Sequence, residues 1–81
     1  MALLNIGFGN LVEAAKIVAI ISPDSAPAKR RIAEAKKSGE IIDATQGRKT
    51  RSVIFMESGC LVLSAVLPET IYARSQEGEP L

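Results

Sequence analysis

Apolar and polar residues alternate along residues 3–8, so that Leu4, Ile6 and Phe8 share one side of an extended chain. A period of two is typical of a strand with one buried face. Residues 7–10, Gly-Phe-Gly-Asn, then interrupt the alternation. Glycine and asparagine tolerate positive φ angles, so this segment predicts a sharp turn directly after the strand.

Residues 11–21 fit two patterns. A capping sequence at their start favours a helix, whereas residues 17–21 are mostly β-branched and too few for a buried helix. We expect a turn or short helical entry up to about Ala14, followed by a strand over residues 15–21. Lys16 is then expected near the start of this strand, beside the glycine turn, either as a solvated strand end or as part of a cationic surface.

Residues 22–27, Ser-Pro-Asp-Ser-Ala-Pro, end this strand and begin a helix, because Asp24 or Ser25 can cap it and proline is tolerated in its first turn. We expect the helix to run to Ser38 and to end at the following glycine. Its apolar stripe is narrow, which indicates a surface helix with one buried edge. Its cations between Lys29 and Lys37 fit either contact with an anionic partner or a solvated face.

Three further strands are predicted after this helix. Residues 40–43 form a short one, and residues 52–57 and 60–66 form two that a tight turn at residues 58–59 joins. Both faces of this hairpin are apolar. One helix covers only one face, so the other is expected to pack on more of the chain or on a neighbouring subunit.

A second, shorter helix is expected from about Pro68, with Ile71 as its apolar anchor. Residues 76–81 are expected to form a flexible tail. The pattern as a whole predicts a single α+β domain over residues 1–75. It contains a small antiparallel sheet of about four to five strands, one longer central helix and a short C-terminal helix.

Composition adds an expectation of self-association. The chain has 81 residues, of which 47% are hydrophobic and only three are aromatic. A chain of this length buries only about 60–65% of the surface that it exposes when unfolded. Some aliphatic surface is therefore expected to be covered by another copy of the chain.

The net charge of +1 conceals an uneven distribution of charged residues. Residues 29–51 hold eight Lys or Arg against three carboxylates, whereas residues 52–81 hold one Arg against four. The basic segment is the candidate for contact with a partner. A nearly neutral total indicates that nucleic-acid binding would depend on geometry and on repetition of a basic patch, rather than on bulk charge.

The chemistry available to this chain argues against catalysis. It contains no histidine, a single cysteine at Cys60 in an apolar run, and carboxylates that are scattered along the chain. We therefore expect no enzyme, no cofactor, no metal site and no small-molecule substrate. Glu13 and Lys16 interrupt the apolar first 21 residues and no cationic segment precedes them, so we expect a cytoplasmic protein without a membrane span.

The most distinctive stretch is residues 43–51, Asp-Ala-Thr-Gln-Gly-Arg-Lys-Thr-Arg. It joins two predicted strands and brings Arg48, Lys49 and Arg51 together after a glycine, with only small polar neighbours. Such a loop supplies no core, and loops on a rigid scaffold often carry function. The functional interpretation is an anion site for phosphates, and the alternative is a solvated connection whose charges aid solubility.

Four segments also carry a family resemblance: residues 5–10 (NIGFGN), 22–27 (SPDSAP), 43–51 (DATQGRKTR) and 68–70 (PET). They occur in this order and spacing in the extracellular matrix regulatory protein family. Over residues 3 to about 75, the chain therefore resembles the RemA-like proteins of Firmicute-type bacteria.

This resemblance implies a cytoplasmic DNA-binding transcriptional regulator, of the type that activates biofilm and extracellular-matrix genes, assembled as a ring of identical subunits. It implies that Arg48 and Lys49 bind double-stranded DNA and that a basic residue at the position of Lys16 contributes; we include Arg51 in the same site. The family more often has Arg at the positions of Lys16 and Lys49. Lysine keeps the charge for phosphate contact but loses the planar, bidentate donors.

One subunit offers about three or four phosphate contacts, and a ring multiplies them. The hypothesis is that duplex DNA wraps or bends around the ring, with specificity from phasing and bendability. An RNA-binding protein using the same loop is the alternative, disfavoured because no aromatic residue interrupts the basic segment. A structural ring or adaptor is the third interpretation.

Overall fold

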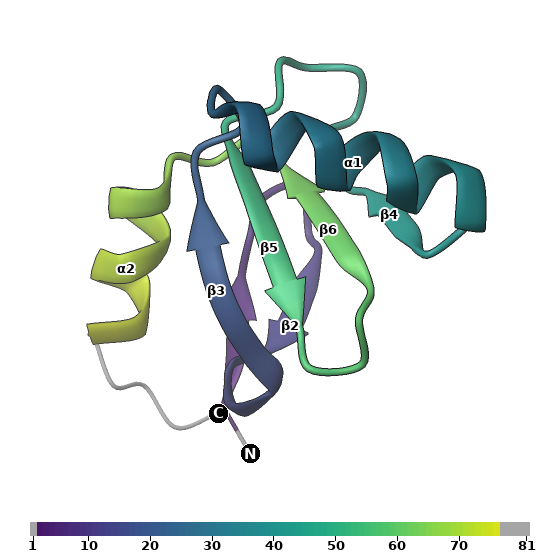
Figure 1. The fold of residues 1–81 in the computed structure, drawn as a ribbon. Helices are drawn as coiled ribbons and strands as arrows, with labels where there is room; N and C mark the ends of the chain where they lie inside the picture. Colours follow the sequence, from purple (N-terminus) through teal and green to yellow (C-terminus); the bar gives the residue numbers. More distant parts are fainter. Residues whose placement is uncertain (1, 77–81) are drawn as a thin grey trace.

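The computed structural model describes residues 2–76 of the chain. In chain order the elements are β1 (Leu3–Asn5), β2 (Leu11–Glu13), the short 3-10 helix η1 (Ala14–Lys16), β3 (Ile17–Ile21), α1 (Ala26–Ser38), β4 (Ile41–Asp43), β5 (Ser52–Met56), β6 (Leu61–Ser64) and α2 (Pro68–Gln76) (Figure 1). The expected α+β class with one longer and one shorter helix is confirmed. The expected flexible tail lies outside the described residues, except for its first residue, Gln76, which ends α2.

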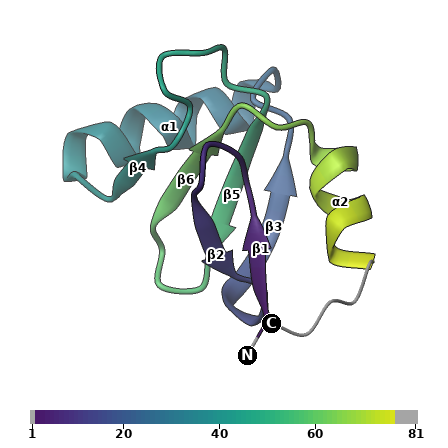
Figure 2. The ribbon, with the colours of Figure 1, turned by 180° about the vertical axis from the view of Figure 1, so that it is seen from behind.

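The strands form two sheets instead of the single antiparallel sheet that the sequence predicts. One sheet has four strands in the order β3-β5-β6-β4, and the other is the two-stranded hairpin β1-β2. Helix α1 crosses one face of the larger sheet, and the hairpin lies against the opposite face with α2 beside it (Figures 1 and 2). The domain therefore has three layers, with the larger sheet in the middle.

The prediction of an entirely antiparallel sheet is wrong at β4, which pairs in parallel with β6. The tight turn after β5 places β6 next to it, and β5 and β6 pair antiparallel. The segment 44–51 between β4 and β5 is too long for a tight hairpin, and it crosses the end of β6. Strand β4 consequently lies on the far side of β6 and runs in the same direction.

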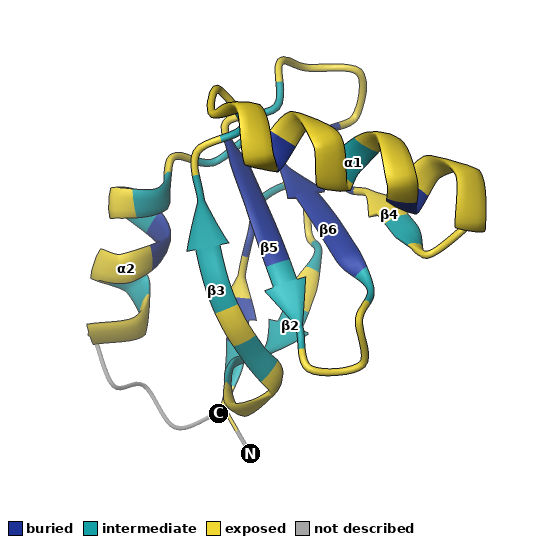
Figure 3. Cartoon of the chain, viewed as in Figure 1, coloured by how far each residue is buried: buried dark blue, intermediate teal, exposed yellow. Residues whose placement is uncertain are grey.

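Each face of the larger sheet has its own core, as the two apolar faces of the predicted hairpin require. On the α1 side, Val53, Leu61 and Leu63 pack with Ala35 of the helix. The residues that form the core on the other side come from the hairpin, the sheet and α2: Leu4, Ile6, Ala44, Ile54, Val62 and Ile71. Strands β5 and β6 are accordingly the most deeply buried elements (Figure 3). The chain itself thus covers the second face, which we expected to need another part of the chain or a neighbouring subunit.

The N-terminal third departs most from the prediction. The first strand ends at Asn5, and residues 11–13 form strand β2 where a turn or helical entry was expected. The helical turn comes later, as η1, and β3 begins only at Ile17. The reason is tertiary: β2 is held by pairing with β1 and by the hydrophobic core, which short local patterns do not show.

Helix α1 has the predicted ends. The hydroxyl of Ser25 accepts a hydrogen bond from the amide of Ala28, and Gly39 ends the helix with a left-handed φ of 80°. A residue without a Cβ adopts that conformation at no steric cost, so the terminus is fixed by local chemistry. None of the helices within residues 2–76 is long and apolar enough to span a membrane.

Candidate nucleic-acid interface

The basic loop, residues 44–51, is anchored at both ends to the last residues of β6. The amide of Ala44 donates to the carbonyl of Leu63 over 2.9 Å, and the amide of Arg51 donates to the carbonyl of Ser64 over 2.8 Å. Strand β6 is wholly buried, so these anchors belong to the core of the domain. The loop is therefore an exposed segment on a fixed base.

The first turn of the loop is held by Asp43. Its carboxylate accepts hydrogen bonds from the amide and from the hydroxyl of Thr45, over 2.9 and 2.6 Å. These bonds, the side-chain one foremost, and the nearby charge of Lys36 lower the pKa of Asp43 below its ordinary value. Thr45 is itself buried, so Asp43 holds the start of the loop against the domain.

The tip of the loop is a tight turn from Thr45 to Arg48, closed by a 3.0 Å hydrogen bond from the Arg48 amide to the Thr45 carbonyl. Its two central residues, Gln46 and Gly47, have left-handed φ angles of 55° and 77°. Glycine is suited to the second of these positions because it lacks a Cβ. The turn reverses the chain immediately before the cations begin.

The structure brings together three of the four residues that the sequence assigns to DNA binding. Arg48, Lys49 and Arg51 are all exposed on the loop. Within residues 2–76, no carboxylate lies within ion-pairing distance of any of them. Their charges are therefore available to an external anion.

The loop also borders a cleft of about 310 Å³ at the end of the domain. Residues 49–51 form one wall, and residues 22–24 before α1 and 67–69 at the start of α2 form the others. Three of the four segments that carry the family resemblance therefore meet here, although they are far apart in the sequence. Asp24 and Glu69 place carboxylates in the same cleft as Lys49 and Arg51, so its lining carries both signs of charge.

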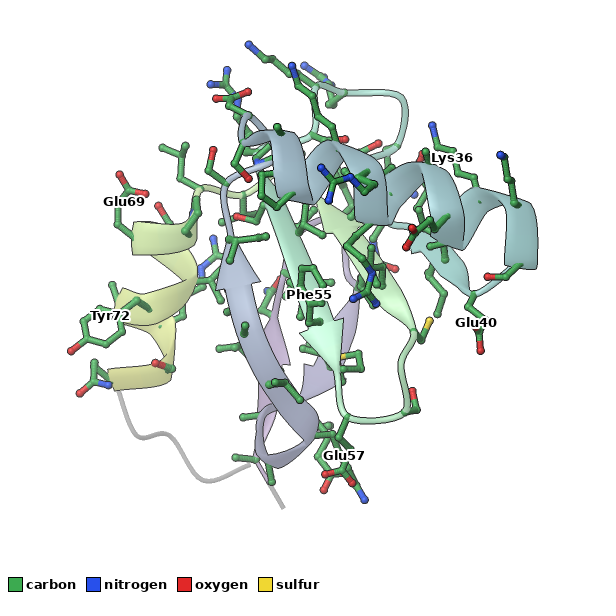
Figure 4. All side chains as sticks on the ribbon, viewed as in Figure 1. Lys36, Glu40, Phe55, Glu57, Glu69 and Tyr72 are labelled. Atoms are coloured by element: carbon green, nitrogen blue, oxygen red, sulfur yellow. The ribbon has the colours of Figure 1, made fainter. Side chains whose placement is uncertain are left out.

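Lys16, the fourth expected residue, lies elsewhere. It is at the opposite end of β5 from the basic loop, since Ile17 pairs with Met56 while Ile21 pairs with Val53. At about 3.3 Å per residue, the length of β5 separates the two positions by roughly 16 Å. The expectation that Lys16 lies beside the glycine turn is also wrong, because its neighbour is Glu57, at the lower end of the domain in Figure 4.

The cations of α1 lie on a different element from the basic loop, although the charge of Lys36 is near enough to Asp43 to lower its pKa. Lys36 stands on the outer side of the helix in Figure 4, away from the sheet. Arg31 is already engaged, because its guanidinium lies 5.4 Å from the centre of the Phe55 ring and its Nε lies 3.6 Å from a carboxylate oxygen of Glu34. The helix thus presents exposed lysines, but its central arginine packs on the domain.

The structure adds a neighbour to the loop that the sequence analysis did not assign to the site, the glycine turn at residues 7–10. Ser64 joins the two segments, since its carbonyl accepts from the amide of Arg51 and its hydroxyl donates to the carbonyl of Ile6. Phe8, in this turn, is 53% exposed. The contact joins residues 58 positions apart, so no local pattern could have revealed it.

Fold and site together define a small α+β domain that presents a fixed cationic loop. Comparison with known proteins places it further: the model of the RemA-like family, described as extracellular matrix regulatory protein A-like, matches residues 3–74. The chain belongs to this family, as the sequence resemblance indicated.

Relatives are similar over nearly their whole length. A protein of Dictyoglomus turgidum is 61% identical over 98% of this chain and 93% of its own length, and one of Moorella thermoacetica is 58% identical over 98% and 87%. A protein of Geobacillus kaustophilus is 55% identical over 91% of this chain and 85% of its own length. The first two are named "Putative regulatory protein", and the third carries the same name with a locus label.

Proposed function

We propose that the chain is a DNA-binding transcriptional regulator, of the type that activates extracellular-matrix and biofilm genes, and that it acts without catalysis in the cytoplasm. The family and the names of its relatives support a regulatory role. The observation that carries DNA binding is the anchored loop, which exposes Arg48, Lys49 and Arg51 without a carboxylate partner among residues 2–76. Phosphate oxygens are the anions that such a group of cations contacts on a duplex.

One copy of the loop binds weakly, so the proposal includes assembly into a ring. Two apolar grooves lie at opposite edges of the larger sheet. The β3–α2 groove, of about 640 Å³, is bordered by Val18, Ile20 and Tyr72. The β2–β4 groove, of about 770 Å³, is bordered by Leu11 and Ile42 among others.

The two grooves differ in their residues, so a contact between one groove and the other repeats from subunit to subunit in a head-to-tail manner. A head-to-tail contact that closes gives a ring, and each subunit then has both grooves covered. Exposed apolar side chains border both grooves, with Val18 68% and Ile42 56% exposed. In this proposal, a second copy of this chain occupies each groove.

A ring repeats the basic loop at regular intervals, which allows a bent duplex to contact several loops at once. Specificity then derives from the bendability and phasing of the DNA more than from base contacts. Lys16 borders the β2–β4 groove and is about half exposed. In this proposal it contributes a second phosphate contact, separate from the loop, at the rim of the contact between subunits.

The test is a titration of duplex DNA at several salt concentrations with the wild type and the double variant Arg48→Ala/Lys49→Ala. In a plot of the logarithm of the binding constant against the logarithm of the salt concentration, the slope is about −0.9 for each phosphate contacted. We expect a steep slope for the wild type and a much smaller one for the double variant. Equal assembly mass of the two proteins, measured beforehand, ensures that only the loop differs.

The matched control is Lys29→Ala/Lys37→Ala, which removes two exposed cations from α1 and leaves Lys36, near Asp43, in place. We expect it to retain most of the affinity. Equal losses in the two double variants would show that binding follows total charge, and the loop would then not be a site. Competition between duplex DNA and single-stranded RNA distinguishes the DNA-binding function from RNA binding, and failure of both favours a structural ring or adaptor.

A further inference from the structure

Phe8 is an aromatic side chain held outward on a turn that the backbone of the domain fixes. Its φ of 54° lies in the left-handed region, which is uncommon for an aromatic residue. The following residue, Gly9, is also left-handed, at 77°. Despite this conformation the ring is not buried, since 53% of the residue is exposed.

Neighbouring side chains hold the turn in this shape. The Asn5 carboxamide oxygen accepts from the Gly7 amide over 2.8 Å, and the Asn10 side-chain amide donates to the Gly7 carbonyl over 3.0 Å. The backbone amide of Asn10 donates to that same carbonyl. Gly7 in turn approaches Val66 so closely that an added Cβ would lie 3.0 Å from its Cγ2. An unfavourable conformation supported in this way indicates a role for the side chain that it displays.

The turn lies beside the basic loop. Both segments are hydrogen-bonded to Ser64, through the amide of Arg51 and through the carbonyl of Ile6. The two turns also have the same form, with two consecutive left-handed residues, Phe8-Gly9 in one and Gln46-Gly47 in the other. One end of the domain therefore presents cations and an exposed aromatic ring from two adjacent turns.

We propose that Phe8 is an apolar wedge that enters the minor groove of the duplex and partly unstacks a base step, while Arg48 and its neighbours hold the flanking phosphates. Proteins that bend DNA commonly insert Phe, Leu, Ile, Met or Pro between base pairs in this way. Flexible pyrimidine–purine steps are the expected sites of entry, because they unstack most easily. This inference rests on the proposed DNA-binding function and adds the residue that bends the duplex.

The test compares the wild type with Phe8→Asn, because asparagine accepts a left-handed backbone and leaves the turn folded. Four quantities are measured: assembly mass, thermal stability, the salt dependence of duplex binding, and the bend of the DNA by fluorescence energy transfer between its ends. We expect unchanged mass, a stability at least as high as that of the wild type, affinity lower by roughly tenfold, a smaller bend, and the same salt slope as the wild type. Removing a wedge removes no phosphate contact, and this separates Phe8 from the cations of the loop.

Two further variants sharpen the comparison. Phe8→Leu keeps an apolar wedge and should retain most of the affinity and bend. Ala73→Asn, which places the same side chain at an exposed position of α2 outside both apolar grooves, should leave the bend unchanged. If Phe8→Asn binds and bends DNA as the wild type does, Phe8 is not a wedge, although the DNA-binding function stands. A change in assembly mass would show instead that Phe8 contacts another subunit. A wild type that does not bind duplex DNA would refute the proposed function itself.

Discussion

The ammonium of Lys16 lies 3.2 Å from a carboxylate oxygen of Glu57, across the start of β3 and the end of β5. Both side chains are about half exposed, so the pair is worth little to the stability of the domain. The pair matters more for binding, because a lysine that faces a carboxylate has part of its charge neutralised. Glu57 therefore moderates any contact between Lys16 and a phosphate.

We expect Glu57→Gln to raise the affinity for duplex DNA by about two- to fivefold at low salt, since exposed ion pairs are worth up to roughly 1 kcal/mol. The same salt titration as for the loop variants measures this change. A matched control is Glu34→Gln, whose carboxylate faces Arg31 on α1. An affinity that Glu57→Gln leaves unchanged would indicate that Lys16 does not contact DNA.

The hydrogen bonds from Thr45 to Asp43 predict a dependence of stability on pH. The pKa of Asp43 is lowered in the folded chain, so its contribution is complete above its ordinary pKa of 3.8 and is lost as the pH falls below that value through the lowered one. We expect the wild type to be more stable than Asp43→Asn at pH 5 and the difference to vanish toward pH 2. Chemical unfolding of both proteins across this range measures it, and the effects of the other carboxylates cancel. A difference independent of pH would contradict the role of this carboxylate.

We expect the substitution of Ser64 to lower the stability of the domain by more than the small size of this side chain suggests. Its buried hydroxyl donates to the carbonyl of Ile6 over 2.8 Å and accepts from the amide of Val66 over 3.0 Å. Ser64→Ala leaves both backbone groups without this partner, which costs about 1–3 kcal/mol. Thermal or chemical unfolding tests this, with Ser58→Ala in the exposed β5–β6 turn as the control, for which a change within about 0.5 kcal/mol is expected.

The proposed contact between the two grooves can be trapped through Cys60. This residue borders the β2–β4 groove, and Tyr72 is among the residues of α2 that border the β3–α2 groove. The Tyr72 side chain points outward from α2 in Figure 4. Oxidation of Tyr72→Cys should join each subunit to the next and give a ladder of cross-linked species on a non-reducing gel. The double variant Tyr72→Cys/Cys60→Ser should give no ladder. Dimers alone, formed equally well in the double variant, would show a symmetric contact and refute the head-to-tail assembly.

The elements that the sequence predicted well are those whose ends are determined by nearby residues. Helix α1 begins at its serine cap and ends at Gly39, and both interactions join residues only a few positions apart. The β5–β6 hairpin likewise follows from two short apolar runs joined by a tight turn. The exposed loop with Arg48, Lys49 and Arg51 was recognisable because no core-forming residue interrupts its cations.

The features that escaped prediction depend on contacts between distant segments. The parallel position of β4 follows from the path of the basic loop over β6, and β2 exists because β1 and the core hold it. The pairing of Lys16 with Glu57 joins residues 41 positions apart. Lys16 and Glu57 are separated from the basic loop because of the register of β3 on β5, and this register cannot be read from spacings along the sequence.

The two outermost described elements of the chain, β1 and α2, pack against each other, and Arg74 donates a hydrogen bond to the carbonyl of Asn5 over 3.0 Å. Leu4 and Ile6 share one core with Ile71, so this core stays open until α2 has joined it. During synthesis on the ribosome, the apolar residues of the first strand therefore stay uncovered until nearly all of the domain has been made. Removal of α2 would leave that strand permanently exposed and make the chain prone to aggregation.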